Sequence, residues 1–173
     1  MPTPSRPLDS AEERTWALLV GVMTWLPAAL DTRLQDTAGV SHAEYSVLRW
    51  LSQCDGGALH MSRLADRTSV TPSHLSRIVA RLEKRGLVAR TPDPDNGRYT
   101  LARLTGTGGD LVAGQEHDYA ELVRELLLDR LPATERAQLE RIAGRVLTAL
   151  KPECLAAHPD QGGQQLPDGA AAR

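Results

Sequence analysis

The chain has 173 residues, 41% of them hydrophobic and 24% charged, which is the size and composition of one globular domain with a true core. We expect a cytoplasmic protein with no membrane partner, because no apolar run comes close to the ~18 residues of a membrane span and the start of the chain lacks the apolar core of a signal peptide. The two cysteines, Cys54 and Cys154, do not make the disulfide framework of a secreted protein.

Charge is distributed unevenly along the sequence. Residues 61–105 carry nine Lys or Arg against four Asp or Glu, a net charge of +5. The remaining residues carry eleven against eighteen, a net charge of −7, and the two parts together give the −2 of the whole chain. A basic segment in an otherwise acidic chain is the pattern that binding to nucleic-acid phosphates requires.

The first third of the chain predicts two helices after a proline-rich segment, residues 1–8, that we expect to be disordered. From about Asp9 to residue 38, apolar residues alternate at spacings of three and four, which predicts a helix that packs against another helix. Pro27 removes a backbone hydrogen bond inside this helix, so we expect a bend there. Ser41 and Glu44 have the spacing of a capping box and predict the start of a second helix. The apolar seam of the first helix consists of Trp16, Leu19, Met23, Leu26, Leu30 and Leu34.

Residues 61–105 predict a helix, a turn, a second helix and a β-hairpin, which is the element order of a winged helix-turn-helix. The first of these helices covers about residues 62–67. The second lies between Thr71, an N-cap that is followed by Pro72, and Gly86, which occupies the position of a left-handed C-terminal residue. Its apolar stripe, which must face a core, consists of Leu75, Ile78, Val79 and Leu82.

The opposite face of the second helix is small and basic, so it fits a DNA major groove that is lined with acceptors and flanked by phosphates. Its members and flanks are Ser73, His74, Ser76, Arg77, Ala80, Arg81 and Lys84. In the hairpin that follows, residues 87–90 and 99–104 predict the two strands, and Asn96-Gly97 predicts the turn. Arg98 then lies near the tip of the wing, in a position to enter a neighbouring minor groove.

The last third of the chain predicts two more helices. Thr105 is a candidate N-cap for a long helix that reaches about Arg130, although the glycines of its first turn weaken its start. After Pro132, a final helix carries an apolar stripe, and residues 158–173 have so few apolar side chains that we expect a disordered tail. The stripe consists of Leu139, Ile142, Ala143, Val146, Leu147 and Leu150.

The segment TPSHLSRIVARLEKRGLVART, followed by DPDNGRYTLARLT, resembles the MarR (multiple antibiotic resistance regulator) family of bacterial repressors, most clearly from Val40 to Gly108. The wing of that family usually carries Asp-x-Arg, where this chain has Asn96-Gly97-Arg98. The resemblance implies a mainly α fold with a small β-hairpin wing. Residues 41–105 would form the winged helix-turn-helix lobe of a unit that spans residues 9–157. Residues 9–38 and 106–157 would supply the dimerisation helices.

The function that the resemblance implies is that of a homodimeric, ligand-responsive repressor without a cofactor. It would bind double-stranded DNA at a pseudo-palindromic operator and be released by a small effector. Base contacts are expected from the start of the recognition helix, backbone contacts from its basic flanks, and a minor-groove contact from Arg98. The full set of candidate DNA-binding residues is Arg63, Thr71, Ser73, His74, Ser76, Arg77, Arg81, Lys84, Asn96 and Arg98.

Many members of the family bind aromatic or other lipophilic molecules in a cleft between the dimerisation lobe and the DNA-binding lobe. His42 is of particular interest, because the positive end of a helix dipole could receive the carboxylate of such a molecule. The candidate effector residues that the resemblance implies are Trp16, Trp25, His42, Tyr45 and Trp50.

Zinc binding and cysteine oxidation are the two alternatives to sensing a small organic molecule. Some relatives bind zinc near the positions of His42, Glu44, Glu116 and His117, but the spacing of these side chains is not that of a metal site, so we expect no metal. Relatives that sense oxidants use a cysteine in the N-terminal helix. That helix has none in this chain, and we interpret Cys54 as a small buried residue.

No catalytic constellation is evident, since the chain has no nucleophile elbow, no phosphate-binding glycine loop and no carboxylate pair in a definable pocket. We therefore expect a protein that is not an enzyme. Two alternatives stay open on the sequence alone. The winged helix could be a protein-interaction module, or the protein could bind a small molecule without coupling that binding to its affinity for DNA.

Overall fold

The computed structural model describes residues 6–94 and 96–150. The segments predicted to be disordered lie outside this range in part (residues 1–5) or entirely (residues 158–173), as do residues 151–157 of the predicted last helix. The chain divides into two compact units, residues 1–132 and 133–173. The second unit contains α6 (Ala133–Leu150), which confirms the helix expected after Pro132.

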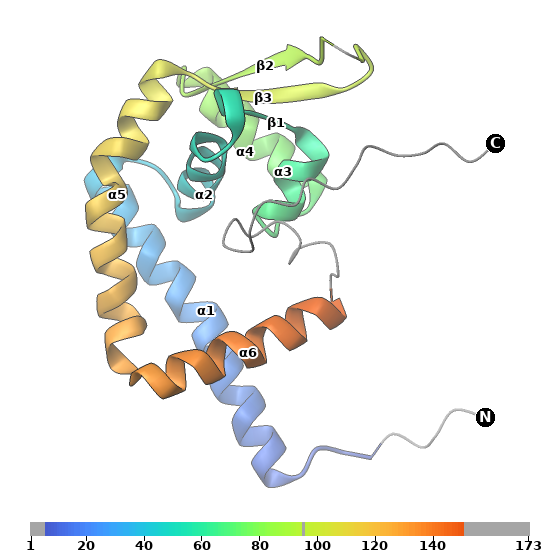
Figure 1. Cartoon of the computed structure of the whole chain (residues 1–173). Coiled ribbons are helices and arrows are strands. Elements are labelled where there is room, and N and C mark those ends of the chain that lie inside the picture. The colour runs from blue at the N-terminus through green and yellow to red at the C-terminus, as the bar shows by residue number, and fades with distance from the viewer. Residues whose placement is uncertain (1–5, 95, 151–173) are drawn as a thin grey trace, which may run out of the picture. The chain divides into compact units, whose positions relative to one another are not determined.

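The first unit contains the winged helix-turn-helix and the helices around it (Figure 1). Its fold is mainly α with a small sheet, as predicted. The elements follow one another as α1 (Ser10–Ala38), α2 (His42–Ser52), the 3₁₀ turn η1 (Asp55–Gly57), β1 (Ala58–His60), α3 (Met61–Arg67), α4 (Pro72–Lys84), β2 (Val88–Pro92), β3 (Thr100–Leu104), α5 (Gly106–Leu126) and the 3₁₀ turn η2 (Leu128–Arg130).

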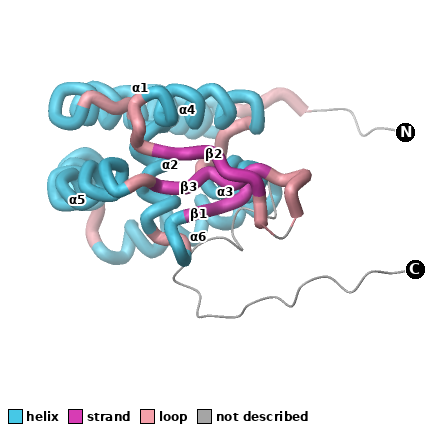
Figure 2. The backbone as a smooth tube through the Cα atoms, turned by 90° about the horizontal axis from the view of Figure 1, so that it is seen from above, coloured by secondary structure: helices cyan, strands magenta, loops and turns pink. Residues whose placement is uncertain are grey.

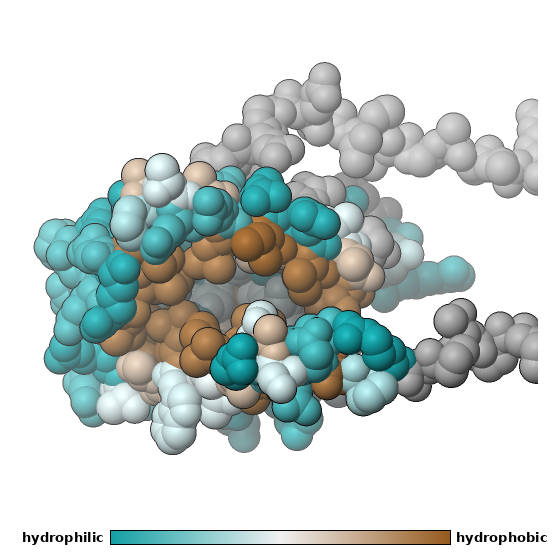
Figure 3. All heavy atoms as spheres, turned by 90° about the horizontal axis from the view of Figure 1, so that it is seen from below, coloured by the Kyte–Doolittle hydropathy of each residue, from teal (hydrophilic) through white to brown (hydrophobic). Residues whose placement is uncertain are grey.

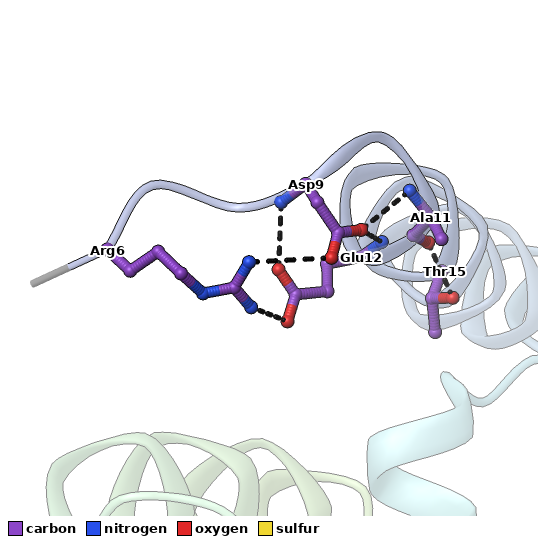
Figure 4. Close-up of polar contacts among 5 residues, drawn as sticks. All are labelled: Arg6, Asp9, Ala11, Glu12 and Thr15. Carbon is purple, nitrogen blue, oxygen red and sulfur yellow. Dashed lines mark hydrogen bonds and ion pairs between the residues drawn. The ribbon is translucent and has the colours of Figure 1, made fainter.

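Helix α1 begins where the sequence predicts, because Asp9 forms a capping box with Glu12 (Figure 4). The Asp9 carboxylate accepts the backbone N–H groups of Ala11 and Glu12 at 2.9 and 3.0 Å, and the Asp9 N–H donates to Glu12 at 2.8 Å. These bonds hold the pKa of Asp9 below its ordinary value. The helix continues through Pro27 without a break and ends at Gly39, whose φ of 63° is left-handed.

The expectation of no membrane-length apolar run is wrong for α1. Residues 15–30 contain no charged side chain. By length and composition alone α1 could cross a membrane: an 18-residue window has a mean hydropathy of 1.2, and only 11% of it is buried. Several apolar side chains of α1 are therefore exposed, Leu18 and Trp25 among them.

The core lies between α2, α3, α4 and the sheet. The stripe predicted for α4 is fully buried in it, and so are Leu64 of α3 and Tyr45 of α2. The turn between α3 and α4 contains Ser69, whose φ of 54° makes it the only described residue other than glycine with a positive φ. This core fixes the direction of α4 and leaves its opposite face at the surface.

The sheet is larger than the hairpin that the sequence predicts. Strand β3 lies between β1 and β2 and is antiparallel to both (Figure 2). Leu59 pairs with Ala102, and Arg90 pairs with Ala102 from the other side. The turn η1 leads directly into β1, a strand that the sequence analysis missed. Strand β1 has three residues, too few for an alternating pattern to be recognised.

The glycine-rich start of α5 has a structural reason at one position. A Cβ atom on Gly108 would lie 2.2 Å from the carbonyl oxygen of Leu87 and 2.8 Å from Cδ1 of Leu104. Thr105 caps the helix by accepting the N–H of Gly108 at 3.1 Å, and its hydroxyl donates to the carbonyl of Gly86 at 2.7 Å. Helix α5 thus begins in direct backbone contact with the segment that joins α4 to the wing.

Candidate nucleic-acid interface

The exposed face of α4 carries the side chains that the sequence assigns to DNA. The recognition-helix candidates are all exposed, whereas the stripe on the other side of the helix is wholly buried. Thr71 caps the helix by accepting the backbone N–H of His74 at 3.3 Å, and Pro72 occupies the first turn. The N-terminal half of this face holds Ser73, His74, Ser76 and Arg77. Their lengths and donor groups suit contacts with base edges and phosphates.

The wing lies next to this face. Asn96 accepts the backbone N–H of Arg98 through Oδ1 at 3.2 Å, so the amide that replaces the family's aspartate still shapes the turn. The wing loop is closed by two backbone bonds, from Asp93 N–H to the carbonyl of Tyr99 at 3.0 Å and from Tyr99 N–H to that of Asn96 at 2.9 Å. Arg98 is exposed at the tip.

A cavity of about 430 Å³ is lined by residues of the wing and of both helices of the helix-turn-helix. It brings together two of the predicted DNA-binding residues, Ser76 of α4 and Arg98 of the wing. Arg63 on α3 and Lys84 at the end of α4 do not line this cavity. The lining residues are His60, Met61, Ser62, Pro72, Ser76, Arg90, Arg98, Tyr99 and Thr100.

Arg81 has a protein partner on the flank of α4. Its Nε donates to Oε1 of Glu44 at 2.9 Å, although 56% of the Arg81 side chain remains exposed. The guanidinium therefore helps to hold α4 against α2, and a direct contact of Arg81 with DNA stays a prediction.

Comparison of the sequence and the fold with known proteins identifies the family of this chain. Residues 40–100 match the MarR family. An HTH-type transcriptional repressor of Mycobacterium tuberculosis (strain ATCC 25618 / H37Rv) is 33% identical over 104 residues, which are 60% of this chain and 73% of the repressor. A MarR family transcriptional regulator from Streptomyces coelicolor, solved in complex with DNA, is 33% identical with a TM-score of 0.83, over 86% of this chain and 92% of that chain. The chain belongs to the MarR family.

A second MarR family regulator from Streptomyces coelicolor, AbsC, is 26% identical with a TM-score of 0.80 and covers 86% of this chain and 99% of its own. The protein is thus a DNA-binding transcriptional regulator with the winged helix of the MarR family. Its relatives are regulators rather than enzymes, in agreement with the sequence analysis.

The candidate effector residues of this MarR family protein lie in separate places. His42 and Tyr45 of α2 pack around Tyr119 of α5, with ring centroids 6.1 and 4.8 Å from that of Tyr119. Trp50, at the other end of α2, lies under the guanidinium of Arg67, 5.2 Å from the ring centroid. The two tryptophans of α1, Trp16 and Trp25, are 56% and 74% exposed.

The cluster around Tyr119 is the one that combines aromatic rings with buried polar atoms. Nε2 of His42 lies 3.2 Å from the Tyr119 hydroxyl, and burial lowers the pKa of the imidazole, an effect that the Asp31 carboxylate opposes. Burial raises the pKa of the hydroxyls of Tyr45 and Tyr119. The Tyr45 hydroxyl is buried without a hydrogen-bond partner among the described residues, and the Arg49 guanidinium lies 6.0 Å from the Tyr119 ring centroid.

The positions weighed for zinc do not come together as a metal site. Glu44 is engaged by Arg81, and the described residues hold no group of three or more histidine, cysteine, aspartate or glutamate side chains able to bind a metal ion. Cys54 is half-buried, and its thiol donates to the carbonyl of Trp50 at 3.2 Å. Burial raises the pKa of this thiol, which disfavours the reactive thiolate.

Sequence reasoning missed the contacts that orient the wing. His60 of β1 pairs with Asp93 of the wing loop at 3.3 Å, and its ring meets that of Tyr99 edge to face at 5.5 Å. Arg90 of β2 bonds to α4, where Glu83 is its ionic partner. Neither pair has a local spacing that a periodicity could detect, because their partners lie on different elements.

Proposed function

We propose that the protein is a homodimeric repressor, acting in the cytoplasm, that binds a pseudo-palindromic operator and is released by a small organic effector. The observation that carries this proposal is the shared cavity of Ser76 and Arg98, which puts the recognition helix and the wing tip at one exposed, basic surface. A relative of 33% identity binds DNA in its crystal structure, and another of the same identity is a repressor.

In this proposal, α4 enters the major groove and the wing reaches the adjacent minor groove. Ser73, His74, Ser76 and Arg77 contact base edges, and Arg98, held by Asn96, enters the minor groove. The phosphate contacts come from Arg63, Thr71, Arg81 and Lys84.

The dimer is proposed from the uncovered apolar side chains of α1. Leu18 and Trp25 are 73% and 74% exposed. Both line a cavity of about 640 Å³ between α1 and the end of α5 that is almost wholly apolar. Figure 3, a view from below, shows hydrophobic side chains exposed at the surface. A stable monomer rarely leaves such a surface in water, and a second copy would cover it while placing two recognition helices about one DNA turn (~34 Å) apart.

The effector is proposed to be an aromatic or lipophilic molecule, with contacts drawn from Trp16, Trp25, His42, Tyr45 and Trp50. Of these, His42 and Tyr45 have the strongest support, because they share the Tyr119 cluster with a buried, unpartnered hydroxyl. A ligand with a polar group could satisfy that hydroxyl. The coupling between ligand and DNA would be on the order of 1–3 kcal/mol.

The test is fluorescence anisotropy with DNA from upstream of the protein's own gene, over a range of salt concentrations, for the wild type and for Arg77→Ala. We expect binding to a discrete palindrome, and in the variant a loss of about 1–3 kcal/mol together with relaxed preference at one base position. Equal binding to all sequences by the wild type would favour the protein-interaction module instead. Ligand binding that leaves the DNA affinity unchanged would favour the uncoupled small-molecule-binding protein.

A further inference from the structure

Arg90 connects the wing to the recognition helix through two of its own groups. Its side chain extends from β2 to α4, where Nη2 donates to the carbonyl oxygen of Ser76 at 2.7 Å. Its backbone N–H donates to Oε1 of Glu83, also on α4, at 3.2 Å. The Nε of Arg90 lies 3.7 Å from the other oxygen of Glu83.

These contacts span more than one turn of α4, since Ser76 and Glu83 are seven residues apart. They fasten one strand of the hairpin to both halves of the recognition helix. The backbone bond to Glu83 uses the outer edge of β2, which the sheet leaves free because β2 pairs with β3 on its other edge. One oxygen of Glu83 therefore accepts the backbone N–H of Arg90, and the other lies at ion-pair distance from its guanidinium.

The position of Arg98 depends on the same hairpin. Strands β2 and β3 are paired from Val88↔Leu104 to Pro92↔Thr100, so the tip moves with β2. Arg90 also lines the cavity that Ser76 and Arg98 share. The contacts of Arg90 with α4 thus bear on the distance between the exposed face of α4 and the wing tip. Arg90 lies close to the surface where α4 and the wing would meet DNA.

We propose that Arg90, with Glu83, is a positioning residue that holds the wing at a fixed distance from the recognition helix, so that Arg98 reaches the minor groove while α4 occupies the major groove. This rests on the proposed contact of Arg98 with DNA. Arg90 acts here through Arg98 rather than by touching a phosphate itself. Its guanidinium is already bonded to Ser76 and faces the negative charge of Glu83.

The proposal is tested by a double-mutant cycle on operator binding with Arg98→Ala and Arg90→Met. In the wild-type background, Arg98→Ala is expected to weaken operator binding about tenfold and to lower the log-log salt slope by about one. In the Arg90→Met background, the same change is expected to cost less than about twofold, because the wing is no longer held in place to contribute. The double variant should then show a salt slope about one below wild type rather than about two.

Three further variants separate positioning from charge and from general stability. Arg90→Lys keeps the charge but lacks the planar guanidinium that bonds to Ser76 through Nη2 while its Nε lies near Glu83, so it should also reduce the cost of Arg98→Ala. Glu83→Ala removes a negative charge near DNA and would tighten binding through charge alone, whereas the positioning role predicts weaker operator binding. Arg103→Met is the matched control, since Arg103 lies on β3 and donates to the carbonyl of Gly56 at 2.9 Å. In that background Arg98→Ala should keep its full cost.

Equal costs of Arg98→Ala in the wild-type and Arg90→Met backgrounds, with the salt slope of the double variant lowered by about two, would overturn the proposal and make Arg90 an independent phosphate contact. Specific operator binding by the wild type that is insensitive to Arg98→Ala would also overturn it, while leaving the repressor function intact. Thermal unfolding of each variant confirms that the measured differences belong to folded protein.

Discussion

Glu44 accepts a hydrogen bond from Arg81 at 2.9 Å and thereby joins the start of α2 to the recognition helix. The Glu44 side chain is only 8% exposed, and its second oxygen accepts the backbone N–H of Ser41 at 2.9 Å and lies 3.8 Å from Arg85. Arg85 in turn donates to the carbonyl of Gly39, at the end of α1, at 2.9 Å. One buried carboxylate therefore connects α1, α2 and α4.

Replacing Glu44 with glutamine is expected to lower the free energy of unfolding by about 1–2 kcal/mol. Glutamine can still accept the Ser41 N–H, but it loses the charge that faces Arg81 and Arg85. The loss is moderate because both arginines are partly exposed and can be solvated. Urea denaturation would show it as a lower midpoint with an unchanged slope.

Glu121→Gln is the matched control for this change. Glu121 pairs with Arg124 on the surface of α5, where both side chains are at least half exposed, so the expected loss is below about 0.5 kcal/mol. Equal effects of the two substitutions would mean that Glu44 is an ordinary cap rather than the junction of three helices.

The first turn of α5 should respond in opposite ways to two neighbouring glycine substitutions. Gly108→Ala places a Cβ 2.2 Å from the carbonyl oxygen of Leu87, a backbone atom that cannot rotate away, and is expected to destabilise the protein by about 1–3 kcal/mol. At Gly109 the nearest atom to a new Cβ is a side-chain carbon 4.0 Å away, so Gly109→Ala should stabilise the helix by up to about 1 kcal/mol. Thermal unfolding of both variants measures the difference, and a stabilising Gly108→Ala would contradict the close approach.

Stability should fall on mild acidification because of His42. Burial lowers the pKa of His42 below its ordinary 6.5, so the folded chain keeps the imidazole neutral at pH values where the unfolded chain protonates it. The unfolded state then binds more protons, and the stability that is present above pH 6.5 is lost as the pH falls through this range toward the folded pKa.

Denaturation midpoints measured at several pH values between 8 and 5 would test this for the wild type and for His42→Gln, which can still bond to the Tyr119 hydroxyl. We expect the variant to lose less stability over this range. His117→Gln, at an exposed position on α5, is the control. Parallel curves for wild type and His42→Gln would refute the assignment.

The proposed dimer predicts a change of oligomeric state when a charge is placed in the apolar cavity of α1. Trp25→Glu puts a carboxylate at a site that dimer formation would bury, and is expected to weaken self-association by about 2 kcal/mol or more. Analytical ultracentrifugation over a concentration series measures it. Arg63→Glu introduces the same side chain on α3 and should leave the dimer intact. An unaltered dimer in Trp25→Glu would place the interface elsewhere.

Local signals in the sequence were sufficient to predict the helices and the exposed face of α4. Caps at Ser41, Thr71 and Thr105 form as predicted, because each depends on residues within one helical turn, and Asp9 caps the helix that was expected to begin near it. The strand β1 and the pairs of Arg90 with Glu83 and His60 with Asp93 could not be predicted, since they depend on contacts between separate elements. The five predicted effector residues lie in different surroundings in the fold. They were chosen because the corresponding helices line the cleft in family members, and a position on a helix does not show which side chains are in contact.

The short strand β1 has one more consequence. A hairpin that projects from a protein normally offers two unpaired edges to any other extended chain, which invites intermolecular sheet formation. Here the three residues of β1 cover one edge of β3, and Glu83 occupies the free edge of β2 at Arg90. Both outer edges of the wing are thus partly occupied within the chain itself, which disfavours intermolecular sheet formation through the surface proposed to meet DNA.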